Sequence, residues 1–258
     1  MNRRSQFSGV LLLLTTTLCL SGLAAELEAG FTSMFNGKDL SGWEGLPEAW
    51  RVIDGAITAE STPDKPCKQA HYLMWRGGKP GDFELRLDFR LEGAGGNSGI
   101  QIRSRELPDW DTSGYQADIE YGDQWTGCLF EHTRGGVAMR GEKVAIDKDG
   151  KKSVSPVAAP EKVQKLISDK TGQGQTLSLS AALLQQVKMG EWNTYTIIAR
   201  GPEITLKIND IVMCQVVDQQ AGVAAKDGVI ALQMHPGPPM KISFKNLRIQ
   251  LPEGKSSN

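Results

Sequence analysis

A stretch of nine residues, Phe83 to Leu91, alternates without exception between apolar and charged side chains. Successive side chains of a β-strand point to opposite faces of a sheet, so the apolar residues of this stretch share one face and the charged residues share the other. This pattern is typical of an antiparallel strand with one buried and one solvated face. It is the clearest strand signal in the chain, and it indicates a fold built on sheets.

Short alternating runs continue on both sides of this strand, and turn signals separate them. The pairs Asn36-Gly37, Asp54-Gly55 and Asn209-Asp210 stand where tight hairpin turns connect neighbouring strands. About a dozen short strands with almost no long helix predict an all-β fold. We therefore expect a two-sheet β-sandwich of the jelly-roll type.

One segment, from residue 159 to 188, departs from the strand pattern. Pro160 stands at a helix start, and apolar residues follow it at helical spacing: Val163, Leu166 and Ile167. A second helical turn or two is expected over residues 181–187. We interpret the whole segment as a short helical insertion on the β scaffold.

The overall charge excludes one large class of function. The chain has 29 Lys and Arg residues against 30 Asp and Glu residues, and it has no long basic run. A nucleic-acid-binding protein is expected to show a basic patch or stripe. With 258 residues and 40% hydrophobic content, the chain is instead suited to one sizeable apolar core.

The first 25 residues have the three parts of a secretory signal peptide. Arg3 and Arg4 give a positive start, residues 10–20 form an apolar stretch, and small residues lead to a cleavage site after Ala25. We therefore expect an exported protein, either periplasmic or secreted.

The mature domain is expected to span residues 26–252, followed by a disordered tail over 253–258. A lipid anchor at Cys19 is not expected, because the bulky Leu18 precedes it where a lipobox has a small residue. No later apolar run approaches the ~20 residues needed to span a bilayer.

Three cysteines remain after the expected cleavage: Cys67, Cys128 and Cys214. Their odd number and wide spacing argue against a disulfide framework and against a zinc knuckle. Cys128 and Cys214 lie in apolar strand-like runs and are predicted to be buried free thiols. Cys67 lies in a loop, where both the free and the paired state remain open.

An unusually polar strand is expected between Gly114 and Tyr121. Gln116, Asp118 and Glu120 share one face of it, with the two carboxylates ~7 Å apart along the strand. Neighbouring carboxylates push their pKa values apart, which is useful in acid and base catalysis. A structural hydrogen-bonding role remains the alternative for each of the three.

Other candidate residues follow at strand ends. His235 ends an apolar strand and precedes a proline-rich loop, and His132 lies between Glu131 and Arg134 after another strand. Histidine is suited to proton transfer and to metal ligation. Arg103 lies in the strand after a glycine-rich turn and, like Arg134, is suited to holding an anionic oxygen, with an exposed charged face as the alternative.

Five blocks of the chain, taken together and in order, resemble the 3-keto-disaccharide hydrolase domain family over about residues 28–251: Gly30 to Trp43, Asn97 to Ile100, Gly114 to Ile119, Glu191 to Gly201 and Ala231 to Met240. The resemblance implies a concanavalin A-like jelly roll, as in lectins and glucanases, and an exported hydrolase that cleaves glycosides of sugars oxidised to a ketone at position 3.

Such chemistry sets clear requirements for a site. The ketone makes the proton at C2 acidic, so a base can remove it, the enolate can expel the C1 substituent, and water can then add back. The candidates for catalysis are Asp118, His235, Glu120 and His132. The candidates for substrate binding are Gln116, Arg103, Arg134 and Glu131.

No cofactor is required by the sequence, but a divalent metal ion remains open. A mixed set of nitrogen and oxygen ligands is available in His132, His235, Asp118 and Glu131, although no local metal-binding spacing exists. A saccharide is the expected partner. The sequence indicates no oligomeric state.

Two other functions remain as alternatives. Lichenase-type glycosidases use a Glu-x-Asp-x-Glu strand on a similar fold, but here Gln116 replaces the first glutamate and cannot act as a carboxylate nucleophile. A non-catalytic carbohydrate-binding module would instead use exposed stacking surfaces. The tryptophans that would serve are Trp43, Trp50, Trp75, Trp110 and Trp125.

Overall fold

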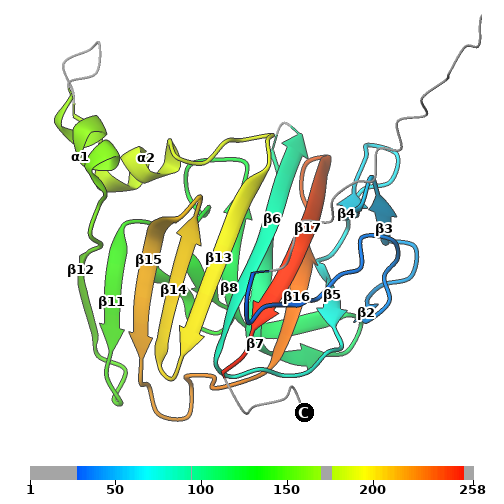
Figure 1. The fold of residues 1–258 in the computed structure, drawn as a ribbon, viewed down its shortest axis with the longest axis horizontal. Coiled ribbons are helices and arrows are strands. Elements are labelled where there is room, and N and C mark those ends of the chain that lie inside the picture. Colours follow the sequence, from blue (N-terminus) through cyan, green and yellow to red (C-terminus); the bar gives the residue numbers. More distant parts are fainter. Residues whose placement is uncertain (1–27, 94, 170–175, 253–258) are drawn as a thin grey trace, which may run out of the picture.

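The structure is a computed structural model that describes residues 28–93, 95–169 and 176–252. The expected signal peptide (1–25) and tail (253–258) lie outside the described residues. Within these, two β-sheets pack as layers around one apolar core, and the strands of the smaller sheet pass behind those of the larger one (Figure 1). The predicted jelly-roll β-sandwich is confirmed.

The larger sheet consists of β1 (Thr32–Ser33), β3 (Trp50–Ile53), β4 (Ala56–Glu60), β6 (Phe83–Gly93), β11 (Glu142–Ile146), β12 (Lys152–Pro156), β13 (Asn193–Arg200), β14 (Glu203–Ile208), β15 (Ile211–Asp218) and β17 (Met240–Gln250). Nine of them follow the order β12-β11-β15-β14-β13-β6-β17-β4-β3, and β1 pairs with β17. The β11–β15 pair is parallel, and the other described pairs are antiparallel.

The smaller sheet consists of β2 (Trp43–Glu44), β5 (His71–Trp75), β7 (Asn97–Leu107), β8 (Asp111–Glu120), β9 (Leu129–Glu131), β10 (Gly135–Ala138) and β16 (Val229–Met234). Their order is β10-β9-β8-β7-β16-β5-β2, and every described pair is antiparallel. The polar strand predicted from the sequence is β8, which lies inside this sheet.

β6 lies between β13 and β17 and has the alternating burial that its sequence predicts. Its apolar side chains enter the core between the sheets, and its charged side chains are half-buried on the other face. Each large apolar side chain that is fully buried contributes roughly 1.5–3 kcal/mol. The core therefore holds the two sheets together mainly through such alternating strands.

Two of the predicted tight turns are confirmed by their backbone geometry. Asp54 and Gly55 have φ angles of 50° and 73°, and Asn209 and Asp210 have φ angles of 50° and 63°. Two consecutive residues with positive φ form the type I′ turn, whose twist matches that of a hairpin. Both turns connect neighbouring antiparallel strands, β3 with β4 and β14 with β15.

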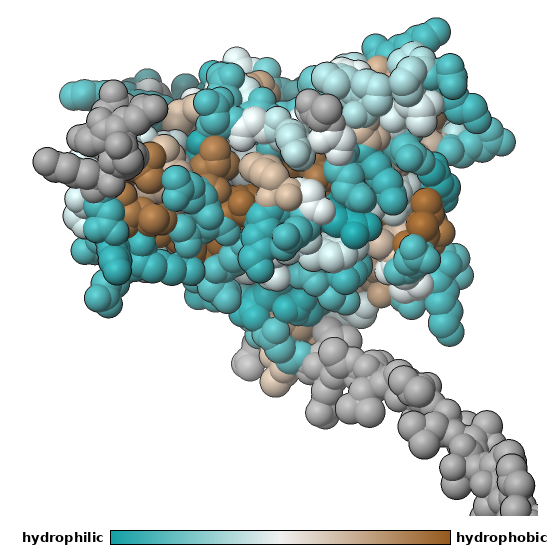
Figure 2. All heavy atoms as spheres, turned by 90° about the horizontal axis from the view of Figure 1, so that it is seen from above, coloured by the Kyte–Doolittle hydropathy of each residue, from teal (hydrophilic) through white to brown (hydrophobic). Residues whose placement is uncertain are grey.

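The helical insertion is confirmed as α1 (Glu161–Ser168) and α2 (Leu179–Leu184). Pro160 is the N-cap residue of α1, and the Ser178 hydroxyl caps α2 by accepting the N–H of Ala181 at 3.1 Å. Figure 2 shows apolar side chains on a surface that is otherwise mostly hydrophilic. Across residues 28–93, 95–169 and 176–252, no helix is long and apolar enough to cross a membrane.

β12 is a strand that the alternation of side chains does not predict. All five of its residues are exposed, so the strand has no apolar face to produce an alternating pattern. It forms an edge of the larger sheet and pairs only with β11 among the described strands. Because backbone hydrogen bonds alone define it, the side-chain pattern did not predict it.

The β7–β8 hairpin bends at a β-bulge beside Arg103, where the pairing register shifts and φ is 47°. Beyond this bend, its tip reaches β5. The Tyr72 N–H donates to the Trp110 carbonyl at 2.8 Å, and Arg76 donates to both carboxylate oxygens of Glu106 at 2.7 and 2.8 Å. The far halves of β7 and β8 thus cross towards β5 and β2 (Figure 1).

Candidate functional site

The candidate site lies on the outer face of the smaller sheet, which is the face turned away from the main core. The core-facing residues of β8 are Tyr115, Ala117 and Ile119. Gln116 and Asp118 therefore point to the outer face, as the alternation predicted. The register places Gln101 of β7 opposite Gln116, and Gly99 opposite Asp118.

A directed chain of hydrogen bonds leads across this face to Asp118. The Ser104 hydroxyl donates to Gln101 Oε1 at 2.5 Å, Gln101 Nε2 donates to Gln116 Oε1 at 2.7 Å, and Gln116 Nε2 donates to Asp118 Oδ1 at 2.6 Å. Each amide uses its oxygen as acceptor and its nitrogen as donor, so the chain has one direction. It fixes the orientation of the Asp118 carboxyl group.

Gly99 makes room for this arrangement. A Cβ atom at position 99 would lie 2.6 Å from Gln116 Cγ and 2.7 Å from its Cδ. The Gln116 side chain therefore leans over a position that must lack a side chain. The glycine is needed because of this close approach, since its φ angle is not among the positive ones.

Asp118 is 3% exposed, and burial raises the pKa of its carboxyl group to about 8. Loss of hydration disfavours the charged form and is the main cause. The negative charge of Glu120 raises the pKa further, whereas the hydrogen bond from Gln116 lowers it. No described cation pairs with Asp118. The carboxyl group can therefore take up or release a proton near neutral pH.

Glu120 has a different task in the structure, because its carboxylate holds the loop that follows β8. Its Oε2 accepts the N–H groups of Gln124 and Trp125 at 3.1 and 2.8 Å. Arg140 holds the same loop from the other side by donating to the carbonyl groups of Asp123 and Thr126 at 2.5 and 2.6 Å. Arg140 is 4% exposed, so its guanidinium group is held inside the fold by these backbone carbonyl groups.

A second hydrogen-bonded chain ends at His132. Gln233 of β16 lies opposite Tyr72 of β5 and donates through Nε2 to the Tyr72 hydroxyl at 2.9 Å. The same hydroxyl lies 3.3 Å from His132 Nε2, and His132 Nδ1 lies 3.0 Å from the Gly114 carbonyl oxygen. Burial raises the pKa of Tyr72 to about 12, so its hydroxyl stays protonated. The chain connects an exposed histidine with a buried amide.

Aromatic rings continue the outer face beside these chains. Phe130 lies opposite Gln116 in the register. It makes edge contacts with Trp125 and His132, with ring centroids 5.8 and 5.7 Å apart. Aromatic surfaces beside polar groups are typical of saccharide sites, because they pack against sugar rings.

His235 follows β16 on the same side of the sheet as Gln233. Continuing the register in which Leu232 lies opposite Ile100 sets His235 opposite Asn97, and Asn97 pairs with Glu120. The described hydrogen bond of the His235 ring is to its neighbour Pro236, at 2.6 Å. The structure thus brings His235 to the same end of the sheet as Glu120 without a direct bond to Asp118.

Arg103 does not lie with Asp118. The bulge breaks the alternation that would have set it beside Gln101, and its guanidinium group donates to the carbonyl groups of Gly81 and Gly201 at 2.7 and 2.8 Å. A contact of 3.3 Å to Asp82 completes its surroundings. Arg103 therefore joins loops at the other end of the sandwich, and its expected role in substrate binding is not supported by its position.

Glu131 and Arg134 also lie away from Asp118. Glu131 pairs directly with Tyr115, which faces the core, so Glu131 is on the core side of the sheet as well. Arg134 contacts Glu131 at 3.1 Å and Asp218 at 2.7 Å, and Asp218 accepts the Tyr115 hydroxyl at 2.5 Å. Burial would raise the pKa of Asp218, but Arg134, Tyr115 and the Gln220 N–H together lower it. This ionic cluster stabilises the fold, so the expected substrate-binding role of both residues is not supported.

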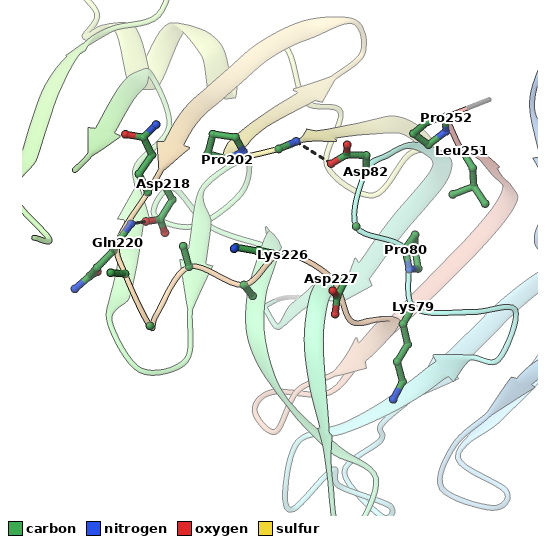
Figure 3. Close-up of a pocket in the computed structure, with 17 residues that line it drawn as sticks. Lys79, Pro80, Asp82, Pro202, Asp218, Gln220, Lys226, Asp227, Leu251 and Pro252 are labelled. Atoms are coloured by element: carbon green, nitrogen blue, oxygen red, sulfur yellow. Dashed lines mark hydrogen bonds between the residues drawn. The ribbon is translucent and has the colours of Figure 1, made fainter. Parts of the chain in front are cut away.

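A cavity of about 880 Å³ lies near that cluster, lined by the loops 79–82, 201–202, 218–227 and 251–252 (Figure 3). β6 begins beside this cavity at Phe83 and runs roughly 34 Å to Gly93, close to the start of β7. The cavity therefore lies at the opposite end from Glu120 and His235. Its lining contains no aromatic side chain.

The proposed metal ligands are not assembled. Within the described part of the chain, no group of three His, Cys, Asp or Glu residues is arranged to hold a metal ion. Glu131 faces the core side, whereas Asp118 faces the outer side. The structure therefore separates the mixed ligand set that the sequence left open.

The three cysteines among the described residues are free. Cys128 and Cys214 are buried thiols, as predicted, and Cys67 is half-buried and also free. Burial raises the pKa of Cys128 to about 12 and that of Cys214 well above its usual value. These thiols are therefore unreactive core groups.

Two of the five candidate tryptophans are not available as stacking surfaces. Trp43 and Trp50 are each 5% exposed and belong to the main core. Trp50 also donates its indole N–H to His71 at 3.2 Å, which gives that buried histidine a structural role. The other three candidates, Trp75, Trp110 and Trp125, are half-buried, and Trp125 contacts Phe130.

Three residues of the site were missed by the sequence analysis: Gln101, Tyr72 and Gln233. Gln101 and Gln233 are glutamines whose neighbours on both sides are large apolar residues, and such a buried amide must find hydrogen-bond partners. That signal was present in the sequence. The position of Tyr72 depends on the pairing of β5 with β16, which the local pattern does not specify.

The two packed antiparallel sheets define a jelly-roll β-sandwich of the kind found in glycosyl hydrolases. A putative glycosyl hydrolase from Parabacteroides distasonis ATCC 8503 matches over 86% of this chain and 93% of its own, with 16% identity and a TM-score of 0.52. A second putative glycosyl hydrolase from the same organism matches over 86% and 98%, with 20% identity and a TM-score of 0.50. At these identities the likeness shows the fold.

The family follows from the sequence match. The model of the 3-keto-alpha-glucoside-1,2-lyase-like domain matches residues 30–250. The chain therefore belongs to this family, in agreement with the resemblance of its sequence blocks, and its function is related to carbohydrates. No curated protein matches the chain.

Proposed function

We propose that the protein cleaves 3-keto-α-glucosides by removing the proton at C2 of the oxidised sugar. The ketone at C3 accepts the electron pair of the broken C2–H bond, so an enolate forms. When the ketone re-forms, the electrons make a C1=C2 double bond and expel the oxygen at C1, which takes up a proton. Addition of water to this double bond completes the hydrolysis.

Asp118 is the base in this proposal, and its environment is the observation that carries it. A general base works best when its pKa is close to the working pH. Burial brings the pKa of Asp118 to about 8, and Gln116 holds one of its oxygens. The family description, which names a 3-keto-alpha-glucoside-1,2-lyase, supports the choice of substrate.

The remaining roles go to neighbours on the same face. We assign to His235, at the end of the sheet where Glu120 lies, the role of proton donor to the leaving oxygen. We place His132 at the rim of the sugar site, beside Phe130. Gln116 has a second N–H besides the one given to Asp118, which suits a substrate oxygen. Glu120 positions the loop that follows β8. If the expected signal peptide acts, this reaction takes place outside the cytoplasm.

The test offers the purified protein a 3-keto-α-disaccharide labelled with deuterium at C2, beside its unoxidised parent. Cleavage of the keto sugar alone is expected, with a primary isotope effect and loss of the deuterium to solvent. Accumulation of an unsaturated sugar would show that the reaction stops at elimination. Cleavage with the deuterium retained, or release of sugar from neither compound, would refute the proposal.

A further inference from the structure

Arg140 is a buried cation without a carboxylate partner. It lies in the connection between β10 and β11 and is 4% exposed, and no described carboxylate lies within ion-pair distance of it. Its three guanidinium nitrogens donate to backbone carbonyl groups instead: Nε to Ser180 at 2.9 Å, Nη1 to Thr126 at 2.6 Å and Nη2 to Asp123 at 2.5 Å. Arginine is rarely buried without an anionic partner, so its position calls for a reason.

The carbonyl groups that Arg140 holds belong to two segments far apart in the sequence. Asp123 and Thr126 lie in the 121–128 loop, which connects β8 with β9, whereas Ser180 lies in the first turn of α2. Two buried side chains of the main core anchor α2 in turn. The planar fork of arginine can hold several acceptors in a fixed geometry, which lysine cannot do. Arg140 therefore braces the loop against the helical insertion.

Glu120 holds the same loop through the opposite set of backbone groups. Its carboxylate accepts the N–H groups of Gln124 and Trp125, whereas Arg140 binds carbonyl oxygens. The Thr126 hydroxyl closes the loop by accepting the Glu120 N–H and donating to the Glu120 carbonyl group, both at 2.8 Å. The loop thus lies between an anion that binds its donors and a cation that binds its acceptors.

Trp125 is the side chain that this loop brings to the candidate site. It is half-buried, and its ring contacts that of Phe130, with centroids 5.8 Å apart and an interplanar angle of 87°. Phe130 lies opposite Gln116, whose amide holds Asp118. The indole ring therefore adjoins the polar outer face on the side of β9, and its open part is suited to packing against a sugar ring.

The side chains of Asp118 and Trp125 have separate supports. Asp118 is oriented by the amide of Gln116 and by the chain of hydrogen bonds behind it, in which Arg140 takes no part. Trp125 is placed by the loop, and thus by Arg140. A change at Arg140 should therefore affect the binding of a sugar more than the transfer of its proton.

We infer that Arg140 is a positioning residue for the sugar site. It fixes the 121–128 loop against α2, so that Trp125 offers its ring to the sugar that Asp118 deprotonates. Arg140 itself is buried and acts through the loop. This role rests on the proposed function for the identity of the sugar, whereas the binding contact needs no catalysis.

The test compares Arg140→Lys with Arg103→Lys, because both arginines are buried and both donate to backbone carbonyl groups of two separate segments. Both changes should lower the melting temperature, since each leaves buried carbonyl groups without their donors. Arg140→Lys should raise KM for a 3-keto-α-disaccharide about tenfold with little change in kcat, because packing against the indole ring is lost. Arg103→Lys should leave both constants nearly unchanged.

A double change shows whether Arg140 acts through Trp125. Trp125→Ala should raise KM at least as much as Arg140→Lys does, and it serves if Arg140→Lys does not fold. Adding Arg140→Lys to Trp125→Ala should raise KM little further, because the ring that Arg140 positions is already absent. Increases in KM that multiply in the double variant would show that Arg140 does not act through Trp125.

Calorimetry separates this inference from the proposed function. Binding of the keto sugar is measured in proteins that also carry Asp118→Asn, which prevents turnover. If the unmodified protein binds the sugar without cleaving it, and Arg140→Lys weakens binding while Arg103→Lys does not, the positioning role stands and the proposed reaction fails. Unchanged KM and affinity in folded Arg140→Lys, or equal losses in both arginine variants, would overturn the inference even if the sugar is cleaved. A protein that binds no keto sugar would overturn both.

Discussion

Asp118 and Asp218 are buried to the same extent, each 3% exposed, yet their carboxyl groups differ in charge. Asp118 has one neutral amide donor and no described cation, and burial raises its pKa to about 8. Asp218 has the Arg134 guanidinium at 2.7 Å, and its pKa is lowered in spite of burial. The guanidinium group beside Asp218 keeps that carboxyl group ionised, whereas Asp118, with a neutral donor, can exchange its proton near neutral pH.

The comparison also separates two ends of the molecule. Asp118 lies on the outer face of the smaller sheet with aromatic rings and directed amide chains, whereas Asp218 joins loops beside the cavity of Figure 3. The cavity is lined by Asp218, which pairs with Arg134, and it contains no aromatic side chain. We therefore place the chemistry at the polar site around Asp118.

The largest expected effect separates the two aspartates by activity. Asp118→Asn removes the proposed base and should lower kcat for a 3-keto-α-disaccharide by about 10²–10⁴-fold. Asp218→Asn should leave kcat per folded molecule close to that of the unmodified protein, because Asp218 ends β15 of the larger sheet and pairs with Arg134. Steady-state kinetics measures kcat for both variants, and circular dichroism checks that each variant is folded. Equal losses in both variants would remove the distinction.

The next effect concerns stability. Arg134→Met leaves Asp218 buried without its cation and should lower the free energy of unfolding by about 3–5 kcal/mol. The double change Arg134→Met with Asp218→Asn should recover part of this loss, since the stranded charge is gone. Denaturant unfolding measures both. A loss below about 1 kcal/mol for Arg134→Met would show that the pair does not hold Asp218.

A smaller effect is expected at Gly99 of β7, the strand between β8 and β16. Gly99→Ala places a Cβ 2.6 Å from Gln116 Cγ and should displace the amide that holds Asp118. Overpacking of this kind costs about 1–3 kcal/mol, and kcat should fall with it. Gly136→Ala is the control, since its Cβ would meet the flexible Met139 side chain at 3.1 Å. Unchanged activity in Gly99→Ala would show that the Gln116 contact is dispensable.

The smallest expected effect is the change in the free energy of unfolding for each pH unit. The unfolded chain ionises Asp118 above about pH 4, whereas the folded chain keeps it protonated until about pH 8. The folded state binds more protons in this window, so Asp118 lowers the free energy of unfolding as pH rises, by up to about 1.4 kcal/mol per pH unit. Asp118→Asn should remove this slope.

The contribution of Asp218 to the free energy of unfolding should change with pH in the opposite direction. Its folded pKa is lowered, so its contribution to stability is complete above its ordinary pKa and is lost as the pH falls through the lower folded value. Asp218→Asn should therefore make acid unfolding less steep without changing the slope between pH 4 and 8. Urea unfolding across the pH range measures both variants, and an unchanged slope in Asp118→Asn would show that another group titrates there.

Much of the architecture was predictable from local pattern. The alternation of Phe83 to Leu91, the turn pairs at Asp54 and Asn209, and the helical spacing after Pro160 each correspond to an observed element. The polar face of Gln116 and Asp118 was also predictable, because strand parity is a local property. The exposed edge strand β12 was not, since it has no apolar side to produce a period.

The grouping of the site required the tertiary structure. A bulge turned Arg103 away from Gln101, and the parity of β9 put Glu131 on the core side, although both lie near the polar strand in sequence. Tyr72 and Gln233 joined the site through pairing of distant strands.

The sequence by itself determined the fold class, the polar face of β8 and the family, because strand alternation and turn chemistry act between near neighbours in the chain. Only the tertiary structure decided which carboxyl group stays ionised. Asp118 and Asp218 are the same residue type in strands of different sheets. Their pKa values diverge because packing of the two sheets brings Arg134 to Asp218, whereas Asp118 is buried with the neutral amide of Gln116, its neighbour two residues away on β8.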